Sequence, residues 1–119
     1  MLVSPHASIR MVAEHLFGRI PSLLVKERFL NFETIRKVKC STFILHGVAD
    51  ETVPYSHAVL LGKQCGGKVT LVLSNNKGKQ AMTHNKMRPK HDLIEPLQDF
   101  MDDVDDEQRR RQLSIFSRR

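Results

Sequence analysis

The chain has 119 residues, enough for one folded domain around one core and too few for two domains. Hydrophobic residues make up 40% and charged residues 27%, which is typical of a globular protein and excludes a disordered or collagen-like chain. Lysine and arginine number 19 against 13 acidic residues, so the formal net charge is +6 and an anionic partner has to be considered.

Cysteine usage and hydropathy indicate a reduced, cytoplasmic setting. Cys40 and Cys65 lie far apart and neither belongs to a Cys-x-x-Cys motif, so we expect free thiols. The histidines show no His-x-x-x-His helix pair, and we expect no metal and no cofactor. No apolar run approaches the roughly 20 residues of a membrane span, and the first residues lack the features of a signal peptide.

The first third of the chain predicts helices. Apolar residues within 9–17 recur at the i, i+3, i+4, i+7 spacing of one helical face, and Gly18 with Pro21 marks the end of that helix. Residues 22–39 mix apolar and basic side chains at the spacing of short helical turns. We expect a partly buried connecting segment there.

The middle of the chain predicts a βαβ unit. Residues 42–46 and 69–73 are nearly continuous apolar runs rich in β-branched side chains, which is typical of strands buried on both faces of a parallel sheet. Residues 55–65 between them have helical spacing and end at a glycine pair. The predicted class is therefore α/β with parallel strands and flanking helices.

A polar loop follows at residues 74–80 and leads to His84, and apolar residues at helical spacing within 93–104 predict an amphipathic helix. Residues 105–119 are charged and poor in core material, and we expect a disordered tail. No acid lies between Glu51 and Asp92, while seven basic residues do, which predicts a positive surface around the loop of His84.

Asp50 and His84 are the candidate site residues. Each follows one of the two predicted strands, and the carboxyl ends of adjacent parallel strands share one edge of the sheet, so the two side chains should meet. A carboxylate that orients a histidine makes the imidazole a general base. The alternatives are a turn-capping aspartate and a loop histidine bonded to the backbone. His46 and His57 are interpreted as structural.

Residues 4–104 resemble the C-terminal portion of the α/β-hydrolase fold, in particular serine hydrolases of the membrane-associated, depalmitoylase-like branch. The resemblance rests on Phe-Ile-Leu-His-Gly-Val-Ala-Asp at 43–50, Val-Pro-Tyr-Ser-His at 53–57 and Met-Thr-His-Asn at 82–85. It implies an incomplete hydrolase sheet within 1–104, followed by the tail at 105–119. It also implies that Asp50 and His84 are the acid and base of a Ser-Asp-His triad.

The family's nucleophile lies in a G-x-S-x-G motif, and none of the six glycines here stands two positions before a serine. We therefore expect a C-terminal fragment of a serine hydrolase, inactive by itself, whose intact form acts on acyl esters or thioesters, including those of lipidated proteins. The resemblance also implies peripheral membrane association through a missing N-terminus.

The alternative is a non-catalytic basic module that binds an anionic membrane surface or a polyanion. Nucleic acid is the less favoured partner, because no set of stacking aromatic residues accompanies the basic ones.

Overall fold

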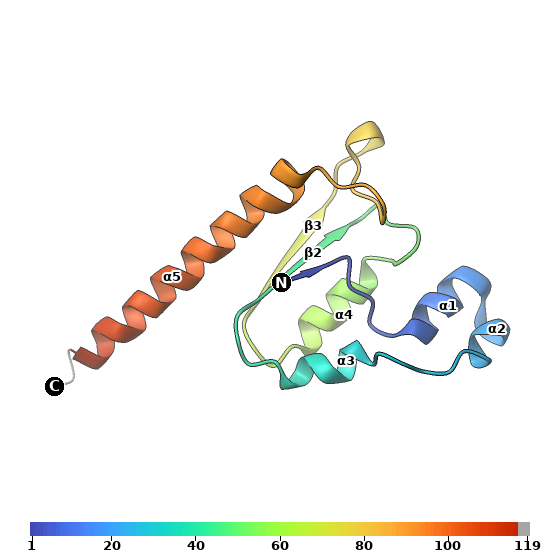
Figure 1. Ribbon diagram of the computed structural model, residues 1–119, viewed down its shortest axis with the longest axis horizontal. Coiled ribbons are helices and arrows are strands. Elements are labelled where there is room, and N and C mark those ends of the chain that lie inside the picture. The colour runs from blue at the N-terminus through green and yellow to red at the C-terminus, as the bar shows by residue number, and fades with distance from the viewer. Residues whose placement is uncertain (117–119) are drawn as a thin grey trace.

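The computed structural model describes residues 1–116 and shows an α/β fold on a three-stranded parallel sheet (Figure 1). The strands are β1 (Leu2–Val3), β2 (Thr42–Gly47) and β3 (Val69–Ser74), in the order β1-β2-β3. The register places Ile44 of β2 between Leu2 and Leu71. The predicted fold class and both predicted strands are confirmed.

The helices agree with the sequence pattern in the first hundred residues. They are α1 (Ile9–Phe17), α2 (Arg19–Leu23), α3 (Asn31–Thr34), α4 (Ser56–Gln64) and α5 (Glu95–Phe116). Single 3₁₀ turns occupy Ile35–Lys37 and Gly78–Gln80, and a π-helical segment, Pro89–Ile94, precedes α5. The segment expected to hold short helical turns, residues 22–39, does so through the end of α2, through α3 and through the first 3₁₀ turn.

One face of the sheet is covered by α4. Ala58 and Leu61 of this helix pack with Ile44 of β2 and with Ile35, and all four side chains are buried. Alternate residues of a strand point to opposite faces, so this cluster takes only half of the side chains of β2.

The opposite face is covered by the start of α5. Phe43 and Leu45 of β2 are fully buried there against Met82, and the rings of Phe43 and Phe100 lie 5.5 Å apart between centroids. Because β2 has a core on each side, its whole length is buried, which explains its nearly continuous apolar sequence.

The last helix extends further than the sequence predicts. α5 continues as one helix to residue 116 and projects away from the sheet (Figure 1), where composition predicts a disordered tail from residue 105. Composition does not show that Glu107 and Arg111 are spaced to pair along a helix. Arg111 Nη2 lies 2.7 Å from Glu107 Oε1 one helical turn away, and Lys68 Nζ lies 3.2 Å from Glu107 Oε2. Residues 117–119 of the expected tail lie outside the described part of the chain.

The first helix forms as predicted, but few of its apolar side chains are buried. The Ser8 hydroxyl caps α1 by accepting from the backbone N–H of Met11 at 3.2 Å, and Gly18 ends it with a φ of 85°. Ala13 is its buried residue, whereas Leu16 and Phe17 are exposed. The apolar stripe that identified this helix is therefore largely open to solvent in the described structure.

Candidate active site

Asp50 lies in a tight turn directly after β2. Its backbone N–H donates to the Gly47 carbonyl at 3.1 Å, and its side chain is completely buried. Carboxylate oxygen Oδ1 accepts from the backbone N–H groups of Thr52, at 3.0 Å, and Val53, at 2.9 Å. The turn-capping alternative is thus correct for one oxygen of Asp50, and the other oxygen, Oδ2, faces a histidine.

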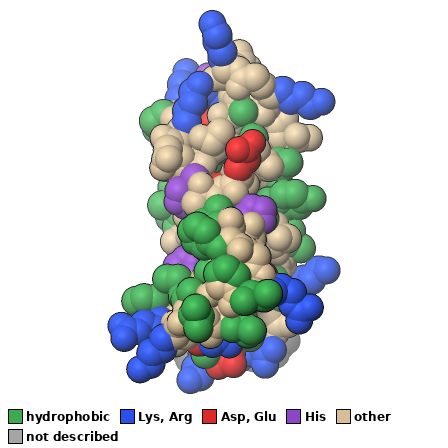
Figure 2. Space-filling view, turned by 90° about the vertical axis from the view of Figure 1, so that its right-hand side faces the viewer, with side chains coloured by type: hydrophobic (Ala, Val, Ile, Leu, Met, Phe, Trp, Pro, Cys, Tyr) green, Lys and Arg blue, Asp and Glu red, His purple; other side chains and the backbone are tan. Residues whose placement is uncertain are grey.

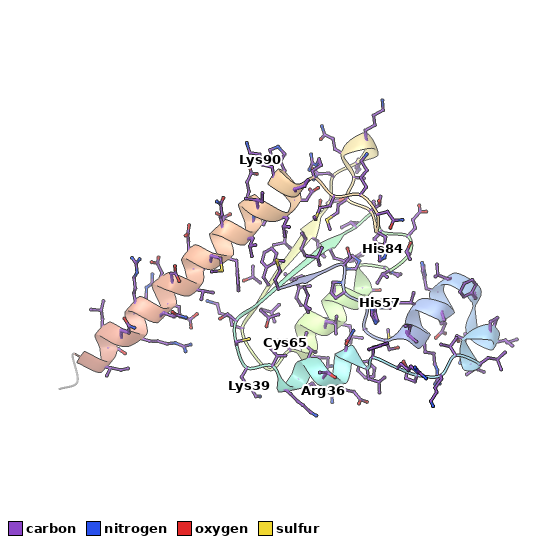
Figure 3. All side chains as sticks on the ribbon, viewed as in Figure 1. Arg36, Lys39, His57, Cys65, His84 and Lys90 are labelled. Atoms are coloured by element: carbon purple, nitrogen blue, oxygen red, sulfur yellow. The ribbon has the colours of Figure 1, made fainter. Side chains whose placement is uncertain are left out.

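That histidine is His84, whose Nδ1 lies 3.1 Å from Asp50 Oδ2. The preceding Met82 is buried in the core, and Thr83 and Lys86 exchange backbone hydrogen bonds of 2.9 and 3.4 Å, so His84 sits at the tip of a two-residue turn. Figure 3 shows His84 at the end of the sheet, on the loop that follows β3. The predicted meeting of Asp50 and His84 is confirmed.

Gly47 makes this meeting sterically feasible. A Cβ atom at this position would collide with the backbone carbonyl of Met82. The absence of a side chain at the end of β2 lets the segment before His84 run directly past it. The glycine therefore fixes how closely the histidine turn approaches the Asp50 turn.

The hydrogen bond to Asp50 determines which imidazole nitrogen is basic. An ionised carboxylate only accepts hydrogen bonds, so His84 Nδ1 carries the proton and Nε2 keeps its lone pair. No group in the described part of the chain hydrogen-bonds to Nε2, and the His84 side chain is 38% exposed. The pair can therefore accept a proton at Nε2, while the buried carboxylate stabilises the imidazolium that forms.

A second histidine reaches the same carboxylate. The buried His46 ring donates from Nε2 to the Val53 carbonyl at 2.7 Å, and the same nitrogen lies 3.5 Å from Asp50 Oδ2. Donation to a carbonyl fixes the proton on Nε2, and Nδ1 has no hydrogen-bond partner among the described residues. His46 thus packs at the strand end, as predicted, and also borders the acid.

His57 has the structural role that its position predicts. It is the second residue of α4, it is buried, and its Nδ1 accepts from the backbone N–H of Ala7 at 3.1 Å. Burial, with smaller contributions from nearby histidines, lowers the pKa of His57. The neutral ring joins the start of α4 to the segment between β1 and α1 (Figure 3).

Two open hollows flank His84. One, of about 350 Å³, is lined by Ser4, Met82, Met87 and neighbouring residues. The other, of about 400 Å³, is lined by Ala49, Glu51 and Asn85 among others. Ser4 follows β1 with a φ of 43°, an uncommon value for serine, and it lines the same hollow as His84.

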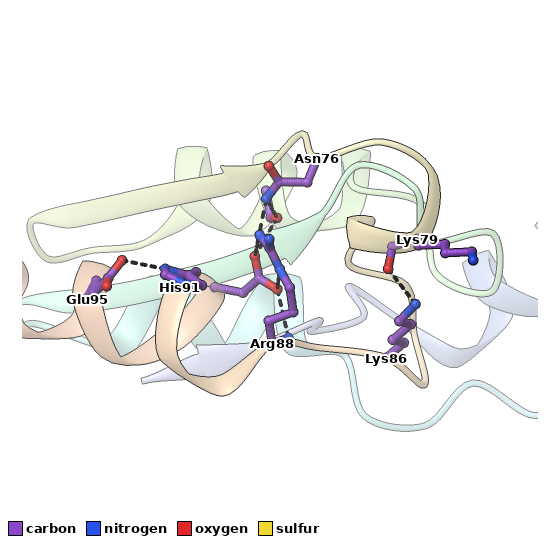
Figure 4. A network of polar contacts seen from close by, with 8 residues as sticks. Asn76, Lys79, Lys86, Arg88, His91 and Glu95 are labelled. Atoms are coloured by element: carbon purple, nitrogen blue, oxygen red, sulfur yellow. Dashed lines mark hydrogen bonds and ion pairs between the residues drawn. The ribbon is translucent and has the colours of Figure 1, made fainter.

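A polar network around the buried Asp92 holds the loop that carries His84 (Figure 4). Asp92 lies in the π-helical segment and accepts from the Arg88 backbone N–H at 2.8 Å, the Arg88 guanidinium at 2.9 Å and the Ser74 hydroxyl at 3.1 Å. Asn76 adds a longer bond of 3.4 Å to the same carboxylate. Hydrogen bonds from Arg88 hold the pKa of Asp92 at about 2. The network joins the end of β3 to the start of α5.

The sequence pattern alone does not indicate this role of Asp92. The available signal was the i,i+4 spacing of Arg88 and Asp92, which is the spacing of an ion pair on a helix. Ser74 gave no comparable signal, because its contact with Asp92 depends on how the chain returns to the end of β3.

The basic residues between Glu51 and Asp92 are divided between the two ends of β3. Lys63 and Lys68 lie at the opposite end of β3 from the histidine loop, and Lys68 pairs with Glu107. Arg88 is bound to Asp92, and Lys86 Nζ donates to the Lys79 carbonyl at 2.5 Å. The loop itself carries Lys77, Lys79, Lys86 and Lys90 at exposed positions.

Residues 1–116 contain neither a metal-ligand cluster nor a membrane-spanning helix. No group of three histidine, cysteine or acidic side chains there is placed to hold a metal ion. No helix in that range combines the length and apolar character needed to cross a bilayer. Cys40 and Cys65 are free thiols.

Comparison with known proteins supports the α/β-hydrolase superfamily, through one similar protein. The chain is similar to an α/β hydrolase domain-containing protein of Caenorhabditis elegans, aho-3, with 29% identity over 76 residues, or 64% of this chain. The match spans only 21% of that protein's length. No protein-family profile and no solved structure matches the chain. The open parallel sheet with flanking helices is consistent with part of an α/β-hydrolase fold.

Proposed function

We propose that this chain supplies the acid and the general base of a serine hydrolase that cleaves acyl esters or thioesters. The observation that carries the proposal is the 3.1 Å contact between His84 Nδ1 and the buried Asp50 Oδ2, which leaves Nε2 of the partly exposed His84 side chain as a base. The resemblance to the depalmitoylase-like branch makes acyl thioesters of lipidated proteins the favoured substrate class.

In the proposed reaction, a serine hydroxyl attacks the acyl carbonyl and gives its proton to His84 Nε2. His84 then protonates the departing alcohol or thiol, and a covalent acyl-serine remains. Water attacks this ester while His84 again takes a proton, and the acid and free serine are released. Asp50 remains ionised and holds the imidazole in one orientation. The serine comes from a G-x-S-x-G segment that this sequence does not contain.

The geometry can be tested on the chain as it is. NMR of the imidazole nitrogens should show neutral His84 with its proton on Nδ1, the minor tautomer of a free histidine, and Asp50→Ala should abolish that preference. The control is Glu95→Gln, which alters the exposed pair of His91 and Glu95 and should leave the His84 signals unchanged. A His84 proton on Nε2 in the unaltered chain would contradict the proposal.

The chemistry is tested with a serine-reactive fluorophosphonate probe and with a longer form of the protein that includes a G-x-S-x-G segment. The probe should not label the 119-residue chain. If the probe does label this chain, and Ser4→Ala abolishes the labelling, the nucleophile is Ser4 instead. In the longer form, His84→Ala or Asp50→Ala should lower turnover of an acyl thioester by about a thousandfold or more, and His91→Ala should not. Unchanged turnover in His84→Ala would refute the proposed base.

A further inference from the structure

We infer that the end of the molecule formed by α1, α2 and the following connection binds the surface of a bilayer containing anionic phospholipid. This interaction is separate from the proposed hydrolase chemistry, because it uses neither Asp50 nor His84. It also differs from the sequence-based expectation, which placed the positive surface on the histidine loop.

Large apolar side chains are concentrated at this end. Leu24 is 89% exposed and Ile20 is 81% exposed. The exposed apolar residues of this surface, which we call the hairpin patch, are Leu16, Phe17, Ile20, Leu23, Leu24 and Phe29. Figure 2 shows hydrophobic side chains gathered over this end of the molecule. Single exposed apolar residues are ordinary, but six within 14 consecutive positions (16 to 29) indicate an interaction site.

The structure holds this patch in place. Arg10 of α1 donates to the Val25 carbonyl at 3.3 Å and lies 3.6 Å from Glu27, which ties the connection after α2 back onto α1. Phe29 has a φ of 54°, an unfavourable backbone conformation for a bulky residue, and it is exposed to solvent. The contacts of Arg10 therefore hold α1, α2 and the following connection together as one hairpin that carries the apolar groups.

The charges around the hairpin patch indicate an anionic partner. Residues 9–32 contain two acids, and each lies near an arginine: Glu14 is 3.7 Å from Arg19, and Glu27 is 3.6 Å from Arg10. Lys26 and Arg28 are exposed, and no described residue pairs with them. Figure 2 shows basic side chains on both sides of the apolar cluster. An apolar surface bordered by cations fits the acyl and headgroup layers of an anionic bilayer.

The patch is also fixed relative to the candidate active site. His15, in the last turn of α1, forms a 2.9 Å hydrogen bond through Nε2 with the carbonyl of Glu51, the residue after Asp50. Docking of the hairpin patch on a membrane would therefore set the position of the Asp50 turn above the lipid surface.

The test is co-sedimentation of the full chain with vesicles of phosphatidylcholine, with or without about 30% phosphatidylserine, at about 0.1 M salt. The chain should bind the anionic vesicles, and the double variant Ile20→Glu/Leu24→Glu should bind about tenfold less. The matched control is Leu113→Glu/Ile115→Glu, which introduces the same charges at exposed apolar positions of α5 and should stay within about twofold of the original chain.

Two further variants identify the charges. Lys26→Glu/Arg28→Glu should reduce the preference for anionic over neutral vesicles about fivefold or more. Lys77→Glu/Lys79→Glu, on the histidine loop, should change binding by less than about twofold. Circular dichroism verifies that each variant is folded.

Three outcomes would overturn the inference. The first is equal vesicle binding by the original chain and Ile20→Glu/Leu24→Glu. The second is loss of binding in the histidine-loop variant alone. The third is a chain that binds no vesicles and forms a dimer in sedimentation velocity that Ile20→Glu/Leu24→Glu dissociates, since the patch would then serve self-association. His84→Ala should bind vesicles normally, so this inference and the proposed function fail independently.

Discussion

Replacement of Asp92 by asparagine should destabilise the chain in a way that depends on pH. The carboxylate is buried and accepts hydrogen bonds from Arg88 and Ser74, and its pKa is lowered from 3.8 to about 2. A folded-state pKa below the unfolded value means that the ionised side chain stabilises the fold above about pH 4. This stabilisation is lost as the pH falls through about 2.

The lowered pKa determines the size of the effect. A difference of nearly two pKa units corresponds to about 2 kcal/mol of stability near neutral pH, which Asp92→Asn should remove. At about pH 3 the carboxylate of the original chain contributes roughly half as much, so the difference between the two proteins should shrink to about 1 kcal/mol. A substitution that only disturbed packing would give the same difference at both pH values.

Urea unfolding followed by circular dichroism, at neutral pH and at about pH 3, measures this difference. Asp105→Asn removes a carboxylate from an exposed position of α5 and should change the free energy of unfolding by less than about 0.5 kcal/mol at neutral pH. If Asp92→Asn destabilised the chain equally at both pH values, or not at all, the proposed charge-dependent network around Asp92 would be refuted.

The other substitutions probe packing and surface charge by the same unfolding assay. Gly47→Ala should cost about 1–3 kcal/mol, because its Cβ would collide with the Met82 backbone. Gly62→Ala should stabilise the interior of α4 by about 0.5–1 kcal/mol, because alanine is the better helix former and its Cβ would lie in ordinary van der Waals contact, 3.6 Å from Val69 Cγ1. Equal effects of the two substitutions would contradict this reasoning. Phe43→Ala should cost about 3–5 kcal/mol, since the ring is fully buried, and a loss below about 1 kcal/mol would show that the core is not packed as described. Lys68→Ala removes an exposed ion pair with Glu107 and should cost at most about 1 kcal/mol, and a larger loss would mean that this pair anchors α5 to the sheet.

The strands and the meeting of Asp50 with His84 could be predicted because both follow from local pattern and topology. A run such as Phe43-Ile44-Leu45 is apolar throughout only where both faces of a strand are buried, and adjacent parallel strands bring the turns after them together. The contact at 3.1 Å needed one further feature, the glycine at position 47, whose role depends on the path of Met82 in three dimensions.

Other features could not be predicted because they depend on tertiary placement. Periodicity identifies α1 as a helix, but it does not show that Leu16 and Phe17 lack a covering element. The composition of residues 105–119 predicts a disordered tail, whereas the i,i+4 spacing of Glu107 and Arg111 supports a continuous helix. Asp92 was missed because Ser74 and Arg88 converge on it from opposite ends of a loop.

The two oxygens of Asp50 make loop structure and histidine chemistry separable by substitution. In Asp50→Asn the amide oxygen can still accept from Thr52 and Val53, while the NH₂ group would face His84 and donate where the carboxylate accepted. Asp50→Ala removes both contacts. A chain with asparagine at this position should therefore keep its fold and hold His84 in the other neutral tautomer, with the proton on Nε2 and the lone pair on Nδ1.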